Sequence, residues 1–141
     1  MRALLDTCII IDALQNREPF SENAQAIFLL AANQQFIGCI TAKSSTDIYY
    51  LMHHFTHDDK QSRAVLSKLF TLFDVLDTAG IDCRQAIPSK ITDYEDAVMI
   101  ATATRSLVDC IVTRNIHDYA KSSVEVFTPE EFIAKINDDN E

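Results

Sequence analysis

The sequence is poor in the residues that make linkers between domains. Its 141 residues include only 2 Gly and 3 Pro, and no Gly/Ser-rich or Pro-rich stretch divides it. This length is enough for one domain with a real core and short for two. We therefore expect a single domain over residues 1–136, followed by a frayed acidic C-terminal tail at 137–141.

Long hydrophobic runs and paired cysteines are also missing. No apolar run reaches the roughly 20 residues that cross a membrane, and the N-terminus lacks the basic start and cleavage site of a signal peptide. The 4 cysteines form no Cys-x-x-Cys pair. Cys39 and Cys110 lie in apolar, strand-like runs, which favours free thiols over disulfides or zinc ligands. We expect a cytoplasmic protein with no membrane association.

Basic residues are few. The chain has 12 Lys and Arg against 21 Asp and Glu, a formal net charge of -9. This balance argues against a protein that binds nucleic acid passively through a basic face. A nuclease remains compatible with it, because a cluster of metal-binding acids adds negative charge that bound cations neutralise locally.

Strand-like runs alternate with helical patterns along the whole chain. We expect strands at residues 2–6, 36–40, 73–77, 109–113 and 124–127. The expected helices cover 21–34, a segment that begins at Thr41 or Ser44 and passes Met52, 60–70, a short stretch within 80–90, 92–104, and a last helix after Thr128. This alternation predicts an α/β three-layer sandwich with a mainly parallel central sheet of about five strands.

Several local signals set the expected element boundaries. The β-branched run Ile9–Ile11 would extend the first strand by propensity, which leaves that boundary open. Ser21 is placed to cap a helix, and Thr92 with Glu95 and Thr128 with Glu131 have the spacing of capping boxes. The stretch His53–Asp59 is polar and predicts a break between two helices.

Four acids fall at junctions between an expected strand and the structure that follows it. They are Asp6, Asp47, Asp96 and Asp118. In a parallel sheet these junctions face one edge, so the acids should be neighbours in space. Asp6 stands among Leu and Ile, where a carboxylate is costly unless it is paired, protonated or bound to a cation. Asp96 has a simpler alternative role, because acids in a first helical turn interact well with the helix dipole.

Carboxylates that converge without basic partners favour a bound cation. All-oxygen ligands favour Mg²⁺ or Mn²⁺ over zinc. Such an ion can activate water and hold a phosphate for in-line attack, so the acids point to metal-assisted hydrolysis.

The pieces that carry these acids match a known family. They are Leu4-Leu5-Asp6-Thr7, Thr41 to Asp47, Asp93-Tyr94-Glu95-Asp96-Ala97, and Thr113 to Tyr119. Each is weak alone, but their order and spacing together are fairly specific. On these motifs the chain resembles the PIN domain, the fold of VapC-type toxin ribonucleases, from Leu4 to Phe132.

The resemblance implies a Mg²⁺- or Mn²⁺-dependent endoribonuclease of the kind that serves as the toxin of a toxin–antitoxin pair. The catalytic, metal-holding residues would be Asp6, Asp47, Asp96 and Asp118. Asp118 would hold a second metal or the attacking water, with Asn115 beside it, and Thr113 would donate a supporting hydrogen bond. The implied partners are an RNA substrate, an antitoxin protein and a second copy of the chain.

The chain departs from the family pattern at two positions. The second acid is often Glu, and here it is the shorter Asp47. An acid is common where Asn115 stands, and Asn offers an oxygen without charge. These departures leave an alternative open: a catalytically weak or inactive PIN-like module that binds protein or RNA.

The basic residues near the proposed edge also have two interpretations. Lys43, Arg114 and Lys90 are either phosphate contacts or ordinary surface cations, and phosphate contacts would make RNA binding depend on salt.

Two other sites are disfavoured by the sequence. His53 and His57 have the i, i+4 spacing of zinc ligands, but no Cys lies nearby, and a solvated turn is the better interpretation. Asp6-Thr7 is similar to the start of a haloacid dehalogenase-type phosphatase motif. That chemistry needs an acid where this chain has Cys8, so we reject it.

Overall fold

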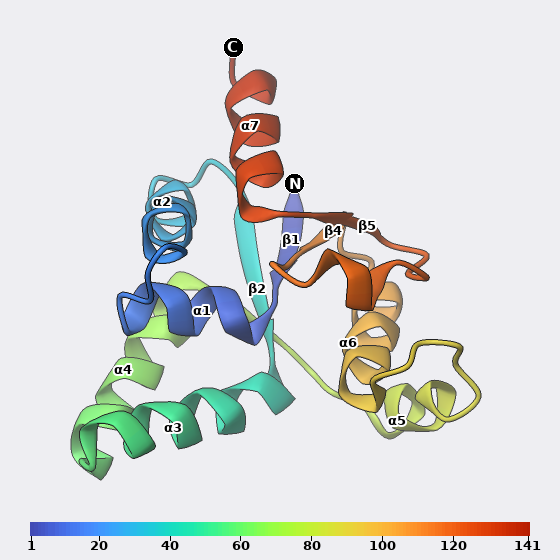
Figure 1. Cartoon of the computed structure of the whole chain (residues 1–141), viewed down its shortest axis with the longest axis horizontal. Helices are drawn as coiled ribbons and strands as arrows, with labels where there is room; N and C mark the ends of the chain where they lie inside the picture. Colours follow the sequence, from blue (N-terminus) through green and yellow to red (C-terminus); the bar gives the residue numbers. More distant parts are fainter.

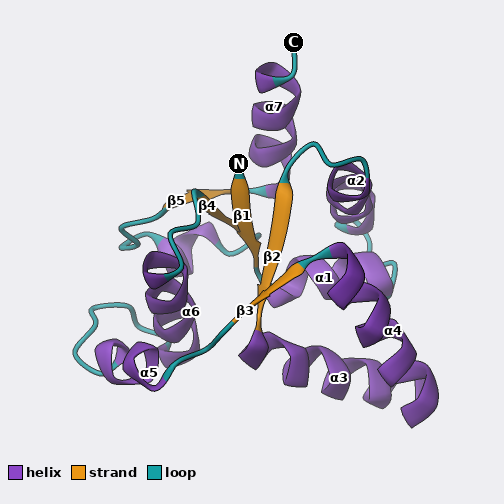
Figure 2. Ribbon diagram, turned by 180° about the vertical axis from the view of Figure 1, so that it is seen from behind, coloured by secondary structure: helices purple, strands orange, loops and turns teal.

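A computed structural model describes residues 1–141 and contains a parallel five-stranded sheet with helices on both faces (Figures 1 and 2). The strands are β1 (Arg2–Leu5), β2 (Ile37–Thr41), β3 (Asp74–Leu76), β4 (Cys110–Val112) and β5 (Glu125–Phe127). Neighbouring strands are parallel, in the order β3-β2-β1-β4-β5. The α/β sandwich predicted from the sequence is confirmed, with the N-terminal strand at its centre.

Two helical layers bury the two faces of this sheet. The helices are α1 (Thr7–Leu14), α2 (Ser21–Ala32), α3 (Ala42–Thr56), α4 (Asp59–Leu72), α5 (Gly80–Ala86), α6 (Tyr94–Arg105) and α7 (Pro129–Asp139), with a short 3-10 helix, η1 (Ile116–Tyr119). Residues on β1 alternate between the layers. Ala3 and Leu5 join the cluster formed with α1 to α4 and α7, whereas Leu4 joins the cluster formed with α6 and η1.

The helix α1 begins directly after Asp6. The strand propensity of its isoleucines kept it from being predicted from the sequence. Ile9, Ile10 and Ile11 favour a strand, yet all three are buried in the larger core cluster as parts of this helix. Tertiary burial therefore outweighs local propensity here. The Asp6 side chain caps the helix by accepting a hydrogen bond from the Thr7 N–H at 2.8 Å.

Three other expected boundaries are wrong by a few residues. Ser21 is the first residue of α2 and does not cap it; its hydroxyl donates to Glu18 at 2.8 Å instead. The cap of α6 is Asp93, not Thr92, because the Asp93 carboxylate accepts the Asp96 N–H at 3.0 Å. The expected break at His53 begins later, since α3 continues through Thr56 and ends with His57 in a left-handed conformation.

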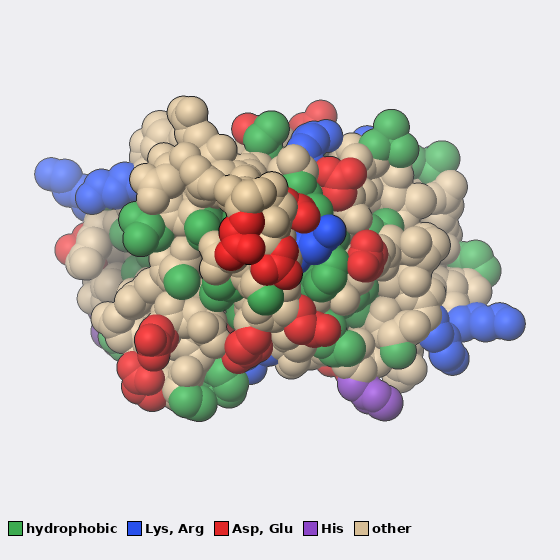
Figure 3. Space-filling model, turned by 90° about the horizontal axis from the view of Figure 1, so that it is seen from above, with side chains coloured by type: hydrophobic (Ala, Val, Ile, Leu, Met, Phe, Trp, Pro, Cys, Tyr) green, Lys and Arg blue, Asp and Glu red, His purple; other side chains and the backbone are tan.

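The capping box at Thr128 and Glu131 is present and opens α7 with Pro129 at its first turn. This helix extends through Asp139, so most of the expected frayed tail is its last turn. Figure 3 views the protein from the end where α7 finishes and the amino ends of the strands lie, and acidic side chains gather near the middle of this face. That end of the molecule is unsuited to a polyanion.

The four cysteines are free thiols. None of the helices combines the length and the apolar character that a membrane span requires.

Candidate active site at the carboxyl edge of the sheet

Asp6 lies at the carboxyl end of the central strand, where its side chain is 9% exposed. Besides the Thr7 N–H, its carboxylate accepts a hydrogen bond from the buried Thr113 hydroxyl, Oγ1 to Oδ2, at 2.8 Å. Burial raises the pKa of Asp6 by more than the hydrogen bonds from Thr113 and Thr7 lower it. Asp6 forms no ion pair within the chain. The centre of the edge thus holds an acid that no lysine or arginine contacts directly.

Asp96 lies in the first turn of α6 and is electrostatically linked to Asp6. Burial, together with the negative charges of Asp93, Asp6 and Asp118, raises the pKa of Asp96 to about 6. A carboxylate shifted this far by burial and by acidic neighbours is a recognised mark of a functional site. The structure therefore brings together three of the four predicted acids: Asp6, Asp96 and Asp118.

Tyr119 supports this group of acids, and the sequence analysis missed it. Its side chain is 1% exposed, and its hydroxyl donates a hydrogen bond to Asp96 Oδ1 at 3.1 Å. Burial and the nearby charges of Asp6 and Asp96 raise the pKa of Tyr119, so the hydroxyl remains a proton donor. One signal was available: a tyrosine directly after Asp118 in a post-strand segment needs a partner for its hydroxyl if it is buried.

Asp47, unlike Asp6, is neutralised by an ion pair within the chain. Lys43 Nζ lies 2.6 Å from Asp47 on the same helix and 3.0 Å from Glu95 at the start of α6. The Lys43 ammonium group therefore lies between the carboxylates of Asp47 on α3 and Glu95 on α6. The sequence placed Lys43 near the edge but did not indicate this pairing with Glu95.

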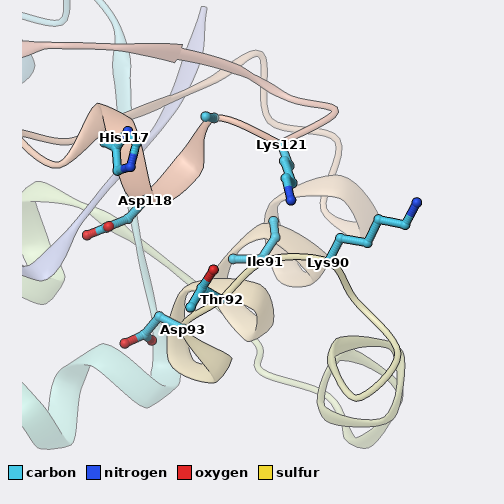
Figure 4. Close-up of a pocket in the computed structure, with 8 residues that line it drawn as sticks. Lys90, Ile91, Thr92, Asp93, His117, Asp118 and Lys121 are labelled. Carbon is cyan, nitrogen blue, oxygen red and sulfur yellow. The ribbon is translucent and has the colours of Figure 1, made fainter.

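Asp118 and Asn115 belong to the segment after β4. Asn115 precedes η1, its backbone N–H donates to Thr113 Oγ1 at 3.0 Å, and its side chain makes no capping contact. Asp118 is exposed on η1. In Figure 4 its carboxylate and that of Asp93 extend to the same side, at one end of a pocket.

Arg114 is held in an ion pair with the buried Asp12. Its Nε lies 2.5 Å from Asp12 Oδ2, and its guanidinium carbon lies 3.9 Å from the centre of the Phe20 ring. Asp12, missed in the sequence analysis, has a side chain only 1% exposed. These contacts disfavour a phosphate role for Arg114 and show that it anchors the segment after β4 to α1.

The residues at the edge suit a hard divalent cation in their chemistry. Burial raises the pKa of Cys8 to about 11, so that its thiol stays protonated and the free ligand atoms are oxygens. No three acids, histidines or cysteines lie close enough to form a closed ligand set. This open arrangement fits Mg²⁺, which commonly keeps several waters and takes only one or two carboxylates from the protein.

We expect Asp96→Asn to stabilise the metal-free protein at pH 7.5. The folded-state pKa of about 6 lies above the usual 3.8, so ionised Asp96 opposes folding above pH 6. This penalty shrinks as the pH falls through 6 and disappears below about 4. Because solvent screens the half-exposed group, the gain should be about 1 kcal/mol.

Urea unfolding at pH 7.5 and at pH 4 measures this gain. The exposed change Asp138→Asn, in the last turn of α7, should produce no such pH-dependent gain. An Asp96→Asn protein that is less stable than the wild type at pH 7.5 would contradict the repulsion inferred at the edge.

Comparison with known families identifies the chain across most of its length. The sequence model of the PIN domain family matches residues 2–117. Among curated proteins, none matches.

Solved structures of similar fold come from bacterial toxin–antitoxin systems. A toxin–antitoxin complex from Klebsiella pneumoniae contains a chain 24% identical to this one, with a TM-score of 0.66, 90% of this chain covered and 97% of that chain. VapBC2 from Rickettsia felis bound to a promoter DNA fragment matches at 16% identity and a TM-score of 0.66, with coverage of 91% and 98%. FitAcB from Neisseria gonorrhoeae matches at 20% identity and a TM-score of 0.66, with coverage of 91% and 98%. At these identities the likeness establishes the fold.

Proposed function

The chain belongs to the PIN domain family, and from this premise we propose that it is a Mg²⁺- or Mn²⁺-dependent endoribonuclease. The observation that carries the proposal is the group of acids at the carboxyl edge of the sheet. Asp6 is buried without an ion-pair partner, and the charges of Asp6 and Asp118 contribute to the raised pKa of Asp96. Such repulsion stores unfavourable energy that a bound cation would relieve.

Each residue of the edge has a distinct role in this proposal. Asp6 and Asp96 would hold the cation, with Thr113 and Tyr119 fixing the orientation of their carboxylates by hydrogen bonds. Asp118, exposed on η1, would orient the attacking water. A divalent cation bound there would lower the pKa of water and stabilise the charge that develops on the phosphate.

Asp47 and Lys43 would act as an exchangeable pair. Asp47 can join the ligands only by giving up its 2.6 Å contact with Lys43. The ammonium group, still 3.0 Å from Glu95, would then have room to face the phosphate of the substrate, where a positive charge is favourable. The Asp47 side chain is one methylene shorter than the Glu common at this position. In this proposal, Asp47 binds the cation and Lys43 binds the phosphate once the two side chains separate.

We also propose that the protein is the toxin of a toxin–antitoxin pair, works in the cytoplasm and forms homodimers. Support for an antitoxin comes from the neighbours in fold, which were solved as complexes with antitoxins. Exposed aromatic side chains on α3, Tyr50 and Phe55, provide apolar area of the kind found at protein interfaces.

Metal removal tests the nuclease proposal. The purified protein should cleave single-stranded RNA when Mg²⁺ or Mn²⁺ is present, and excess chelator should stop cleavage because no alternative neutralises the acids at the edge. Adding back the metal should restore the rate. Cleavage at an unchanged rate in chelator would rule out the metal mechanism.

The second candidate is a binding module without catalytic activity, which the uncharged Asn115 and the net charge of -9 favour. It predicts no cleavage of any RNA and no heat of Mg²⁺ or Mn²⁺ binding in titration calorimetry. A measurable metal affinity that is lost in Asp96→Asn would separate the two candidates in favour of the nuclease.

A further inference from the structure

A pocket of about 490 Å³ opens beside the acids. It lies between the segment that leads into α6, residues 90–93, and the segment around the end of η1, residues 117–121 (Figure 4). Its volume is within the range of about 300–1,000 Å³ that proteins use for small ligands. Because the two walls come from the junctions that carry Asp96 and Asp118, the pocket continues directly from the candidate active site.

The two ends of this pocket have opposite charge. Asp93 and Asp118 lie at the end nearest the sheet, whereas Lys121 and Lys90 lie toward the outer end (Figure 4). Both lysines are exposed, and neither forms an ion pair. They are therefore available to an anion that enters from solvent.

Other cations near the acids are already engaged. Lys43 is bound to Asp47 and Glu95, and Arg114 is bound to Asp12. The opposite end of the molecule is acidic (Figure 3). In a chain with a net charge of -9, the pocket thus supplies two lysines without ion-pair partners, at the end away from Asp93 and Asp118.

We propose that this pocket binds a single-stranded RNA backbone next to the cleaved bond, with Lys121 and Lys90 contacting phosphates that flank it. The inference rests on the proposed nuclease function and adds the path that the RNA strand takes across the protein surface. Ile91 and Ala120 provide an apolar surface, and the exposed His117 ring provides a face on which an unpaired base can stack.

The uncharged part of the lining favours RNA over an acidic protein segment. Asp93 and Asp118 at the inner end repel a peptide carboxylate and an RNA phosphate alike, so the choice between them depends on the uncharged lining. A nucleic acid strand offers bases that can stack on the His117 ring and on the apolar surface of Ile91 and Ala120, and an acidic peptide has no such groups.

Fluorescence anisotropy with a labelled single-stranded RNA, measured in chelator so that no cleavage occurs, tests the pocket. Each phosphate contact on a single strand contributes about 0.7 to the slope of log affinity against log salt. The double variant Lys90→Ala/Lys121→Ala should therefore bind several-fold more weakly at low salt, with a slope shallower by about 1.4. Lys121→Arg, which keeps the charge, should bind like the wild type.

The matched control is Lys60→Ala/Lys68→Ala, which removes two exposed, unpaired lysines from α4. This variant should retain the wild-type affinity and slope. Equal losses in the two double variants would show a general charge effect and overturn the proposal, as would wild-type binding by the pocket variant. Tighter binding of a poly-glutamate peptide than of RNA, lost in the pocket variant alone, would assign the pocket to a protein partner and also overturn it.

Failure of the pocket can be distinguished from failure of the nuclease. If the wild type cleaves RNA and the pocket variant binds RNA normally, the pocket inference fails and the nuclease stands. If RNA binding depends on the pocket lysines but no metal produces cleavage, the pocket proposal is supported, the nuclease proposal fails, and the protein is the binding module.

Discussion

Asp6→Asn is expected to abolish RNA cleavage without weakening the fold. Loss of the central carboxylate removes a ligand of the proposed metal, whose contribution of several kcal/mol corresponds to a fall in kcat of about a thousandfold or more. The amide retains the shape of the side chain, and its oxygen can still accept the Thr7 N–H that caps α1. Initial rates in Mg²⁺ measure the first effect and thermal unfolding measures the second.

The raised pKa of Asp6 gives the sign of the stability change. Because burial disfavours the ionised form, ionised Asp6 lowers stability at neutral pH, and this cost disappears as the pH falls below the unfolded-state pKa. The metal-free Asp6→Asn protein should therefore unfold at the same temperature as the wild type or higher at pH 7.5. Added Mg²⁺ should raise the melting temperature of the wild type only.

Asp58→Asn is the matched control for this experiment. Asp58 also caps a helix, accepting the Gln61 N–H at 3.0 Å at the start of α4, but it is exposed and is not one of the four predicted acids. The same chemical change there should leave both cleavage and stability unchanged. Full activity of Asp6→Asn would remove the central carboxylate from the mechanism.

Arg114→Ala should be the most destabilising of the charge deletions considered. It leaves the Asp12 carboxylate buried with no other hydrogen-bond donor, since both of its contacts, at 2.5 and 3.2 Å, come from this guanidinium. Breaking a buried pair from one side costs about 3–5 kcal/mol. The contact with the Phe20 ring is lost as well. Urea unfolding at pH 7 measures the change.

Arg105→Ala provides a graded comparison. Its partner Asp82 is also fully buried, but the carboxylate keeps hydrogen bonds from the Ala79 N–H at 2.8 Å and the Thr102 hydroxyl at 3.0 Å. The loss should therefore be about 2 kcal/mol or less. The double variant Asp12→Leu/Arg114→Met, which removes both charges, should be more stable than Arg114→Ala. A greater loss for Arg105→Ala than for Arg114→Ala would contradict this account of the buried pairs.

The sequence alone determined the architecture and the position of the acids along it. Alternating strand and helix patterns predicted the parallel sheet, because short buried strands and amphipathic helices carry their periodicity locally. The expected strand at residues 2–6 placed Asp6 at the carboxyl edge, although the helix after it was not predicted. The capping box at Thr128 and Glu131 was also predictable from the sequence, since all of its contacts lie within four residues.

Only the tertiary structure decided which charges meet. Arg114 and Asp12 are 102 positions apart, and Tyr119 and Asp96 are 23 apart, distances over which no local pattern acts. The helix α1 likewise forms against the propensity of its isoleucines because the core buries them. Asp6 remains the centre of the candidate site, while the partners that hold, neutralise or repel each charge come from packing between distant segments.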